Sequence, residues 1–384
     1  SGCWRTEAIF ITGNILFGLL RLRPTKNLGK NPKMTVLYLS RSKLNYSVNA
    51  VYIKGLRQNG ITVKTCQLPA GLRKFYEAVK YCRQNLRDAD LIIVGYDSPG
   101  IAVLMKLTSG KKVVYNALCS IYERLIVSRK LAAPFSFKAL YYWFLDFAAV
   151  HFADLTMLET DNQIKYFSKL FKVSPQKLFR AWTGVEDEVF YQSDQNTDKF
   201  PVFTIVFRGR LLPEAGADVL VRGAKLLDDH ELKIYMLGDG PERGRVERLI
   251  ADLRPKNLEF ISAFLSDNEL RMILQKSHLS LGQLADHARL ERTIPHKAYE
   301  SLALKLPYLT AANKGVLEIL VPNKTCLVCK PGDEKSLAEA ILWAKNHPAE
   351  LNKITENSHR LYQNQLRSHL LANKLLGHIR TVKS

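Results

Sequence analysis

The chain has 384 residues, of which 47% are hydrophobic and 24% charged, a composition that supports two globular domains and excludes a disordered protein. Its formal net charge is +20. Residues 1–180 carry 28 Lys and Arg against 10 Asp and Glu, whereas the remaining residues carry 28 against 26. This asymmetry indicates an anionic partner for the first half, namely a membrane surface, a nucleic acid or an acidic substrate. A basic domain without such a partner is the alternative.

Six cysteines scattered over so long a chain favour a reducing compartment. Cys326 and Cys329 form a single C-x-x-C. A zinc ribbon would need a second such pair, so we interpret both as ordinary strand residues. No His, Cys or carboxylate cluster has ligand spacing, and no metal site is predicted.

The apolar run at residues 8–20 has 13 residues, whereas a membrane-spanning helix needs about 20. Because Arg21 and Arg23 follow it, an interfacial helix is the remaining membrane interpretation. We treat residues 1–33 as an N-terminal extension of uncertain status, to which the sequence assigns no function.

From Met34 onward, apolar strands alternate with helical stretches, which is typical of a parallel sheet covered on both faces. A first domain is predicted at residues 34–191. The segment at 136–152 (SFKALYYWFLDFAAVHF) is aromatic all round with one Asp, and we interpret it as a buried crossover helix in preference to a membrane anchor. The strands predicted in this domain are residues 35–39, 61–65, 91–95, 112–116, 155–159 and 178–183.

A polar stretch at residues 192–199 (QSDQNTDK) predicts an interdomain linker at 192–201. A second alternating series predicts another domain at 202–347, followed by a helical segment at 348–384. Two doubly wound domains leave a ligand cleft between the carboxyl ends of their sheets. The strands predicted in the second domain are residues 202–207, 232–237, 258–261, 278–281, 308–311 and 326–328.

The first motif is FRGRLLPEAG at residues 207–216, between a strand and a helix. Gly209 allows close backbone approach, and Arg210 is placed where it would point into the cleft. Arginine can bind a diphosphate through two hydrogen bonds and stabilise the charge that develops on a departing nucleotide.

The second motif is TIPHKAYE at residues 293–300. Pro295 suits the first turn of a helix, whose N-terminus can hold an anion. Lys297 and Glu300 are three residues apart and share a helix face. One could therefore contact phosphate while the other accepts hydrogen bonds from ribose hydroxyls.

Together these motifs resemble the retaining GT-B glycosyltransferases of family 4. The family's G-R-L-x-P-E-x-G is matched at 209–216, its G-D-G-P at 238–241, its I-P-N-K-x-x-E donor helix at 294–300 and its G-V-x-x-x-x-F hinge at 184–190. The resemblance covers roughly residues 34–384. It implies an α/β GT-B fold, with two Rossmann-like, doubly wound parallel-sheet domains that face a cleft. The donor-binding residues implied are Gly209, Arg210, Gly238, Gly240, Arg292, Ile294, Pro295, Lys297 and Glu300.

Two positions depart from the family pattern. Many relatives have a Lys where this chain has Ala215, and many have a first Glu at the position of Arg292. Arg292 and Lys297 could together replace the missing positive charge. The resemblance gives Arg210 and Lys297 the catalytic role of neutralising the leaving diphosphate.

Two other motifs have simpler explanations. The G-x-G at Gly238 and Gly240 is spaced differently from a dinucleotide fingerprint, and Glu242 would repel a pyrophosphate there. The D-x-D at Asp88 and Asp90 precedes a strand, so it lies at the end away from the cleft and is interpreted as surface capping.

Loops after the strands of the first domain would form the acceptor side. Asp97, Asn116, Ser120 and Glu159 are candidate contacts for sugar hydroxyls, and each could equally be a turn or helix cap. No Ser/His/Asp or Cys/His arrangement for nucleophilic catalysis is present.

We therefore expect a retaining, metal-independent transferase that moves a sugar from a UDP- or GDP-type donor to a lipid-linked or polysaccharide acceptor. No resident cofactor is expected. The basic first domain would lie on the cytoplasmic face of an anionic cell membrane. A catalytically silent nucleotide-sugar-binding protein is the alternative, favoured by Ala215 and Arg292. Nucleic-acid binding is disfavoured because no recognition motif or stacking platform occurs.

Overall fold

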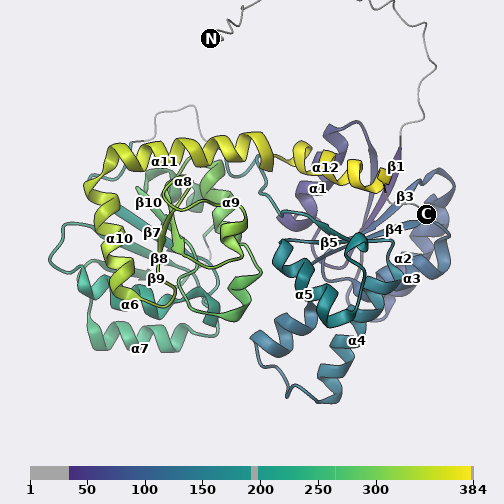
Figure 1. Cartoon of the computed structure of the whole chain (residues 1–384), viewed down its shortest axis with the longest axis horizontal. Coiled ribbons are helices and arrows are strands. Elements are labelled where there is room, and N and C mark those ends of the chain that lie inside the picture. The colour runs from purple at the N-terminus through teal and green to yellow at the C-terminus, as the bar shows by residue number, and fades with distance from the viewer. Residues whose placement is uncertain (1–33, 192–197, 264, 382–384) are drawn as a thin grey trace, which may run out of the picture. The chain divides into compact units, whose positions relative to one another are not determined.

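Two parallel six-stranded sheets organise the chain in a computed structural model, which describes residues 34–191, 198–263 and 265–381. The predicted extension at 1–33 and residues 192–197 of the predicted linker lie outside the described residues. The first sheet has the order β2-β1-β3-β4-β5-β6 (Figure 1). Its strands are β1 (Thr35–Ser40), β2 (Thr62–Gln67), β3 (Leu91–Val94), β4 (Lys112–Leu118), β5 (Leu155–Leu158) and β6 (Leu178–Arg180).

The second sheet has the order β12-β11-β10-β7-β8-β9. Its strands are β7 (Thr204–Arg208), β8 (Lys233–Leu237), β9 (Leu258–Ile261), β10 (Leu279–Leu281), β11 (Tyr308–Ala311) and β12 (Leu327–Cys329). Each strand overlaps one predicted from the sequence, which confirms the α/β, doubly wound fold class.

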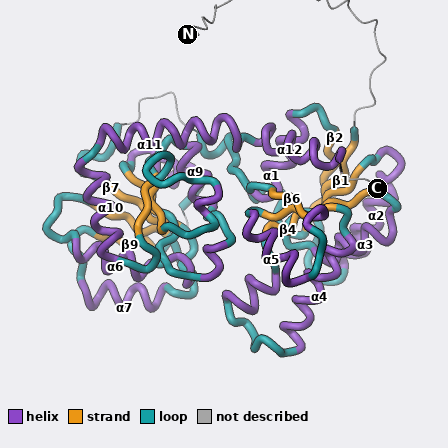
Figure 2. Tube along the Cα trace, in the orientation of Figure 1, coloured by secondary structure: helices purple, strands orange, loops and turns teal. Residues whose placement is uncertain are grey.

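Helices follow most of the strands and cover both sheets, as the purple and orange segments of Figure 2 show. In the first half they are α1 (Ser47–Gln58), α2 (Arg73–Asn85), α3 (Pro99–Ser109), α4 (Phe137–Phe152) and α5 (Asp161–Phe171). In the second half they are α6 (Ala217–Leu226), α7 (Arg243–Leu253), α8 (Asp267–Lys276), α9 (His296–Ala303) and α10 (Glu334–Asn346).

Two interior strands, β1 and β7, are fully buried. All six residues of β1 and all five of β7 are buried, which explains why these strands appear in the sequence as uninterrupted apolar runs. Because the strands of a sheet run parallel, the loops that follow them collect at one edge. The residues predicted for the site come from these loops.

The last two helices, α11 (Pro348–Leu361) and α12 (Ser368–Thr381), return the chain to the first half. α11 packs on α9 and α12 packs on α1 (Figure 1). The Asn59 side-chain amide donates a hydrogen bond to the carbonyl oxygen of His369 at 2.8 Å. The sequence predicted helix here, but it did not predict which elements the helix covers.

The prediction of a fully buried helix at 136–152 was wrong for one face of α4. Ala139, Asp146 and Ala149 are buried, whereas Phe137 is 94% exposed and Phe144 is 57% exposed. An all-round apolar helix has no periodicity that identifies its packed face. No helix in the described ranges is long and apolar enough to cross a bilayer.

Candidate functional site

A cavity of about 330 Å³ lies at the carboxyl edge of the second sheet. Gly209 and Arg210 line it from the end of β7, and Gly238 from the end of β8. Pro295, Lys297 and Glu300 line it from the start of α9. The structure therefore brings residues from both sequence motifs into one pocket, which we call the donor pocket.

Two glycines allow the donor pocket to form, because the loops after β7 and β8 approach each other closely. Gly238 has a φ of +140°, and a Cβ added there would lie 2.0 Å from the carbonyl oxygen of Gly209. Gly209 has a φ of +120° and faces the side chain of Lys297, whose Nζ would be 3.9 Å from an added Cβ. Side chains at either position would be strained.

Lys297 is the most unusual titratable group of the donor pocket. Its side chain is 8% exposed, and its ammonium lies 4.4 Å from the centre of the Phe207 ring. Burial and, to a smaller extent, the positive charge of Arg208 lower the pKa of Lys297 to about 7, against a partly offsetting effect of the Glu300 charge. A lysine in such a site is readily recharged by an incoming anion.

Arg210 adds a second cation to the donor pocket. Among the described residues, neither Arg210 nor Lys297 forms a salt bridge. The N-terminus of α9 opens onto the same cavity after Pro295, which is the N-cap and not, as expected, part of the first turn. This arrangement suits a polyanion such as a diphosphate.

Glu300 is held by a partner that the sequence did not predict. Arg208, at the end of β7, is buried and forms an ion pair with a carboxylate oxygen of Glu300. Arg208 also donates to the hydroxyl of Ser280 at 3.1 Å. Because only one oxygen of Glu300 is engaged by Arg208, the other can accept a hydrogen bond from a ligand hydroxyl. The available sequence signal for Arg208 is its position directly after the apolar strand predicted at 202–207.

A second cavity, of about 550 Å³, shares His296 and Glu300 with the donor pocket. Tyr46, from the loop after β1, and Tyr96, from the loop after β3, line its other side. The donor pocket therefore continues toward the carboxyl edge of the first sheet. Burial lowers the pKa of His296, and the charge of Glu300 partly offsets this effect. Sequence analysis missed His296, although it stands between two predicted residues.

Arg292 does not line the donor pocket, contrary to the expectation that it would supply positive charge there. Its guanidinium binds Glu123 of the first half, with Nε 2.8 Å from Oε1, and lies 4.4 Å from the centre of the Tyr166 ring. Glu123 is 1% exposed and also accepts from Gln163 at 3.1 Å. The buried carboxylate needs a cationic partner, and Arg292 is that partner.

Glu159 also joins the two halves and is not placed to contact an acceptor. Its carboxylate accepts hydrogen bonds from the backbone N–H of Ile294 at 3.0 Å and from the Thr183 hydroxyl at 2.8 Å. Burial raises the pKa of Glu159 to about 7. Ile294 thus contributes to this bridge through its backbone, and its side chain is buried outside the donor pocket.

Gly240 has a supporting position as well, because a Cβ there would lie 2.4 Å from the carbonyl oxygen of Leu211. Of the four predicted acceptor residues, Asn116 and Ser120 are buried, as Glu159 is. Asn116 donates to the carbonyl oxygen of Val48 at 2.8 Å, and Ser120 donates to Asp146 at 2.7 Å. Both therefore have structural hydrogen bonds, the alternative that the sequence left open.

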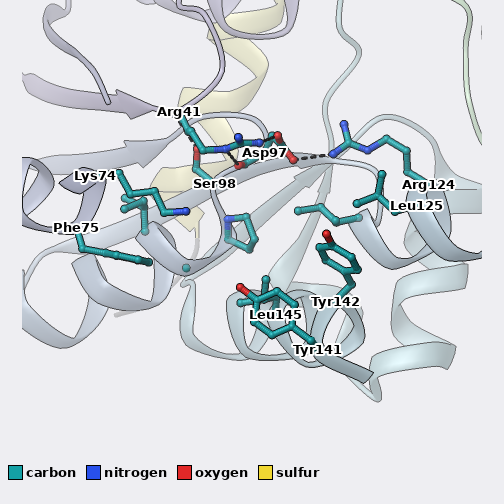
Figure 3. Close-up of a pocket in the computed structure, with 14 residues that line it drawn as sticks. Arg41, Lys74, Phe75, Asp97, Ser98, Arg124, Leu125, Tyr141, Tyr142 and Leu145 are labelled. Carbon is teal, nitrogen blue, oxygen red and sulfur yellow. Dashed lines mark hydrogen bonds and ion pairs between the residues drawn. The ribbon is translucent and has the colours of Figure 1, made fainter. Parts of the chain in front are cut away.

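Asp97 is the acceptor candidate that lines a cavity, one of about 430 Å³ beside α3 and α4. Figure 3 shows its carboxylate between the guanidinium groups of Arg41 and Arg124. The Arg124 Nη2 is 2.6 Å from Asp97 Oδ1. We call this cavity the α3–α4 pocket.

Metal-ligating side chains do not gather in the part of the chain that the structure describes, where no group of three His, Cys, Asp or Glu could hold an ion. Cys326, just before β12, and Cys329, the last residue of β12, are free and buried. Burial raises the pKa of both thiols to about 12.

Comparison with known proteins agrees with this geometry. Residues 192–361 match the family model described as glycosyl transferases group 1. This stretch is therefore similar in sequence to a group 1 glycosyltransferase domain, and the donor pocket, with Arg210 and Lys297, lies within it.

Solved structures similar to most of the chain have the GT-B fold. HepE of Anabaena in complex with UDP superposes with a TM-score of 0.67 at 14% identity, covering 91% of this chain and 100% of HepE. Sucrose-phosphate synthase of Thermosynechococcus elongatus superposes with a TM-score of 0.71 at 14% identity, covering 91% and 99%. The two sheet domains of this chain therefore have the GT-B fold.

Among curated proteins, the MMP α-(1→4)-mannosyltransferase of Mycolicibacterium hassiacum is 24% identical over 199 residues. The match covers 50% of this chain and 45% of that enzyme. The chain thus spans less than half the length of this relative.

Proposed function

We propose that the chain transfers a sugar from a nucleotide-diphosphate donor of the UDP or GDP type to a lipid-linked or polysaccharide acceptor. The observation that carries this proposal is the donor pocket, where Arg210, Lys297 and the N-terminus of α9 face one cavity beside Glu300. The pocket lies in the stretch that matches the group 1 family model. The UDP complex of HepE, which has the same fold, supports the nucleotide assignment.

The reaction requires stabilisation of the negative charge that grows on the departing diphosphate. Arg210 supplies permanent positive charge in a partly dehydrated cavity, where such charge is most effective, and Lys297 adds a second charge once a bound diphosphate restores its proton. We propose that these two residues replace a metal ion in this role. Glu300, oriented by Arg208, would accept hydrogen bonds from the ribose hydroxyls.

Retention of configuration is part of the proposal and rests on the resemblance to family 4. In that family the departing phosphate takes the acceptor proton, so no separate general base is needed. The basic first half supports a location at the cytoplasmic face of an anionic cell membrane. Membrane association is proposed to be peripheral.

A panel of UDP- and GDP-sugars, screened by thermal shift and then assayed for sugar release, tests the proposal. We expect at least one sugar to raise the unfolding temperature and to turn over. Arg210→Ala should reduce kcat about 10²- to 10³-fold. Arg248→Ala, at an exposed position on α7, is the matched control and should leave turnover unchanged. Binding of no nucleotide sugar would contradict the proposal.

A catalytically silent nucleotide-sugar-binding protein is the second candidate. Ala215, where many relatives carry Lys, is 1% exposed, and Arg292 is engaged by Glu123. The donor pocket therefore lacks one cation of the family pattern. Tight binding of a nucleotide sugar without turnover, together with an Arg210→Ala variant that functions normally in cells, would favour this candidate.

A further inference from the structure

A helical hairpin at residues 121–152 exposes an unusually large apolar surface. It consists of a π-helical turn at Glu123–Ser128, a loop and α4, and it extends away from the first sheet at the bottom of Figure 1. Phe135 and Phe137 are 100% and 94% exposed. Leu140, Tyr141 and Phe144 are also exposed, and with Phe137 they follow helical spacing, so that they form one stripe.

The solvent-exposed charges of this hairpin are all positive. Glu123 and Asp146 are its acidic residues, and both are buried. Lys130 and Lys138 are exposed on either side of Phe135 and Phe137. An exposed aromatic stripe that is flanked by lysines and lacks an exposed carboxylate complements an anionic lipid surface.

The α3–α4 pocket opens beside this stripe. Tyr141 belongs to both features, since it is exposed on α4 and lines the pocket (Figure 3). Tyr142 and Leu145 line the same wall, and Phe75 of α2 lies opposite. The pocket therefore has an apolar wall that continues into the exposed face of α4.

The polar side of the α3–α4 pocket has an excess of positive charge. Arg41, Lys74 and Arg124 line it, with Asp97 as the one lining carboxylate. Asp97 is bound by both arginines. In the described part of the chain, Lys74 has no salt bridge, and its ammonium lies 5.0 Å from the centre of the Phe75 ring. Burial and the charge of Arg41 both lower the pKa of Lys74. An anion bound here would relieve this repulsion.

We infer that the α3–α4 pocket binds the phosphate head group of a lipid while the aromatic stripe of α4 enters the bilayer. Lys74 and Arg41 would contact the phosphate, and the lipid tail would leave along Tyr141 toward Phe144. This inference rests on the proposed function and makes it more specific. It assigns the acceptor to the lipid-linked class, in preference to free polysaccharide.

Vesicle binding tests the inference without any donor sugar. The full chain is sedimented with vesicles of phosphatidylcholine alone or with 30 mol% phosphatidic acid, a composition of about one anionic lipid in three. We expect binding to the anionic vesicles. Lys74→Glu should weaken it about tenfold or more. The control is Lys80→Glu, which makes the same charge change at an exposed position on the same helix but outside the pocket.

The apolar contribution is tested with a matched pair of leucines. Leu140 is 59% exposed on α4, and Leu226 is 50% exposed at the end of α6 in the other half. We expect Leu140→Ser to weaken vesicle binding about tenfold and Leu226→Ser to leave it unchanged. Far-UV circular dichroism of each variant verifies folding. Residues 1–33 are present in every variant, so the differences report on the hairpin and the pocket.

Three results would overturn the inference. They are the absence of binding to anionic vesicles, equal weakening by Lys74→Glu and Lys80→Glu, and equal weakening by the two serine variants. A fourth result separates two sources of phosphate. Inorganic phosphate at about 10 mM, enough to occupy a weak site, could stabilise the wild type but not Lys74→Glu against thermal unfolding. If it does so while vesicles do not bind, the pocket takes a soluble phosphate ligand and the inference is overturned. Failure of the proposed function would appear instead as absent nucleotide-sugar binding, which these assays do not involve.

Discussion

Binding of a nucleotide sugar should make Lys297 take up a proton. In the free protein, burial and the charge of Arg208 lower the pKa of Lys297 to about 7. A diphosphate bound between Lys297 and Arg210 reverses the sign of the local field. A unit charge at about 4 Å is worth about 4 kcal/mol at an effective dielectric constant of 20, so the bound lysine should be fully protonated near neutral pH.

The expected stoichiometry follows from this pKa. A free lysine with a pKa of about 7 is about 90% charged at pH 6, about half charged at pH 7 and about 10% charged at pH 8. Binding should therefore take up about 0.1, 0.5 and 0.9 protons at these pH values. By linkage, the Kd should be nearly constant below about pH 6, about double by pH 7, and rise about eightfold from pH 7.5 to 8.5.

Calorimetry of UDP-glucose binding in buffers of different ionisation enthalpy measures this uptake directly. A nucleotide sugar is the appropriate ligand because its diphosphate has no terminal phosphate that titrates in this range. Lys297→Met should abolish the uptake and flatten the pH dependence above pH 7. The control is Lys305→Met. Lys305 lies just beyond the end of α9 and forms a salt bridge with Glu356. This variant should retain both the proton uptake and the pH dependence of the Kd.

Two outcomes would refute this reasoning. If UDP-glucose binds with no proton uptake at pH 8, Lys297 does not meet the diphosphate or is already charged. If the uptake persists in Lys297→Met, another group, such as His296, is its source.

Three further predictions concern stability. Arg292→Ala should lower the free energy of unfolding in urea by about 3–5 kcal/mol because it leaves Glu123 buried without its cation, and a loss below about 1 kcal/mol would show that the pair is not buried in solution. Burial raises the pKa of Glu159 from 4.5 to about 7, so its carboxyl binds a proton more tightly in the folded protein than in the unfolded one. The free energy of unfolding should therefore fall by on the order of 3 kcal/mol as pH rises from 4.5 to 7. Glu159→Gln should remove this fall, and an unchanged pH profile would contradict the assignment. Gly238→Ala should lower the free energy of unfolding, measured by thermal denaturation, by about 1–3 kcal/mol or more, because the added Cβ would clash with the backbone. Gly244→Ala, where nothing lies near an added Cβ, is the control and should not destabilise the protein. Equal effects of the two substitutions would contradict this account.

The sequence by itself determined the two sheets and the donor motifs. Central parallel strands are buried on both faces, so β1 and β7 are apolar runs that a local pattern reveals. The motif residues follow such strands or begin a helix. Because the carboxyl ends of parallel strands share one edge, the convergence of Arg210 and Lys297 on one pocket could be predicted without coordinates.

Tertiary structure alone decided which predicted residues would be bound by the protein itself. Arg292 and Glu123 are 169 residues apart in sequence, and Glu159 and Ile294 are 135 residues apart. The local sequence does not indicate such pairs, because it does not distinguish a buried carboxylate from an exposed one. For the same reason Glu159, Asn116 and Ser120 could be read either as acceptor contacts or as structural groups.

The exposed stripe of α4 was decided in the same way. All faces of this helix are apolar in sequence, so periodicity could not distinguish Phe144, which is exposed, from Ala149, which is buried. Only the position of α4 against α3 shows which face the core uses. Patterns local to the chain therefore determined the secondary structure and the edge at which the site lies. The pairing of charges and the choice of buried face depended on contacts between distant segments, which exist only once the chain is folded.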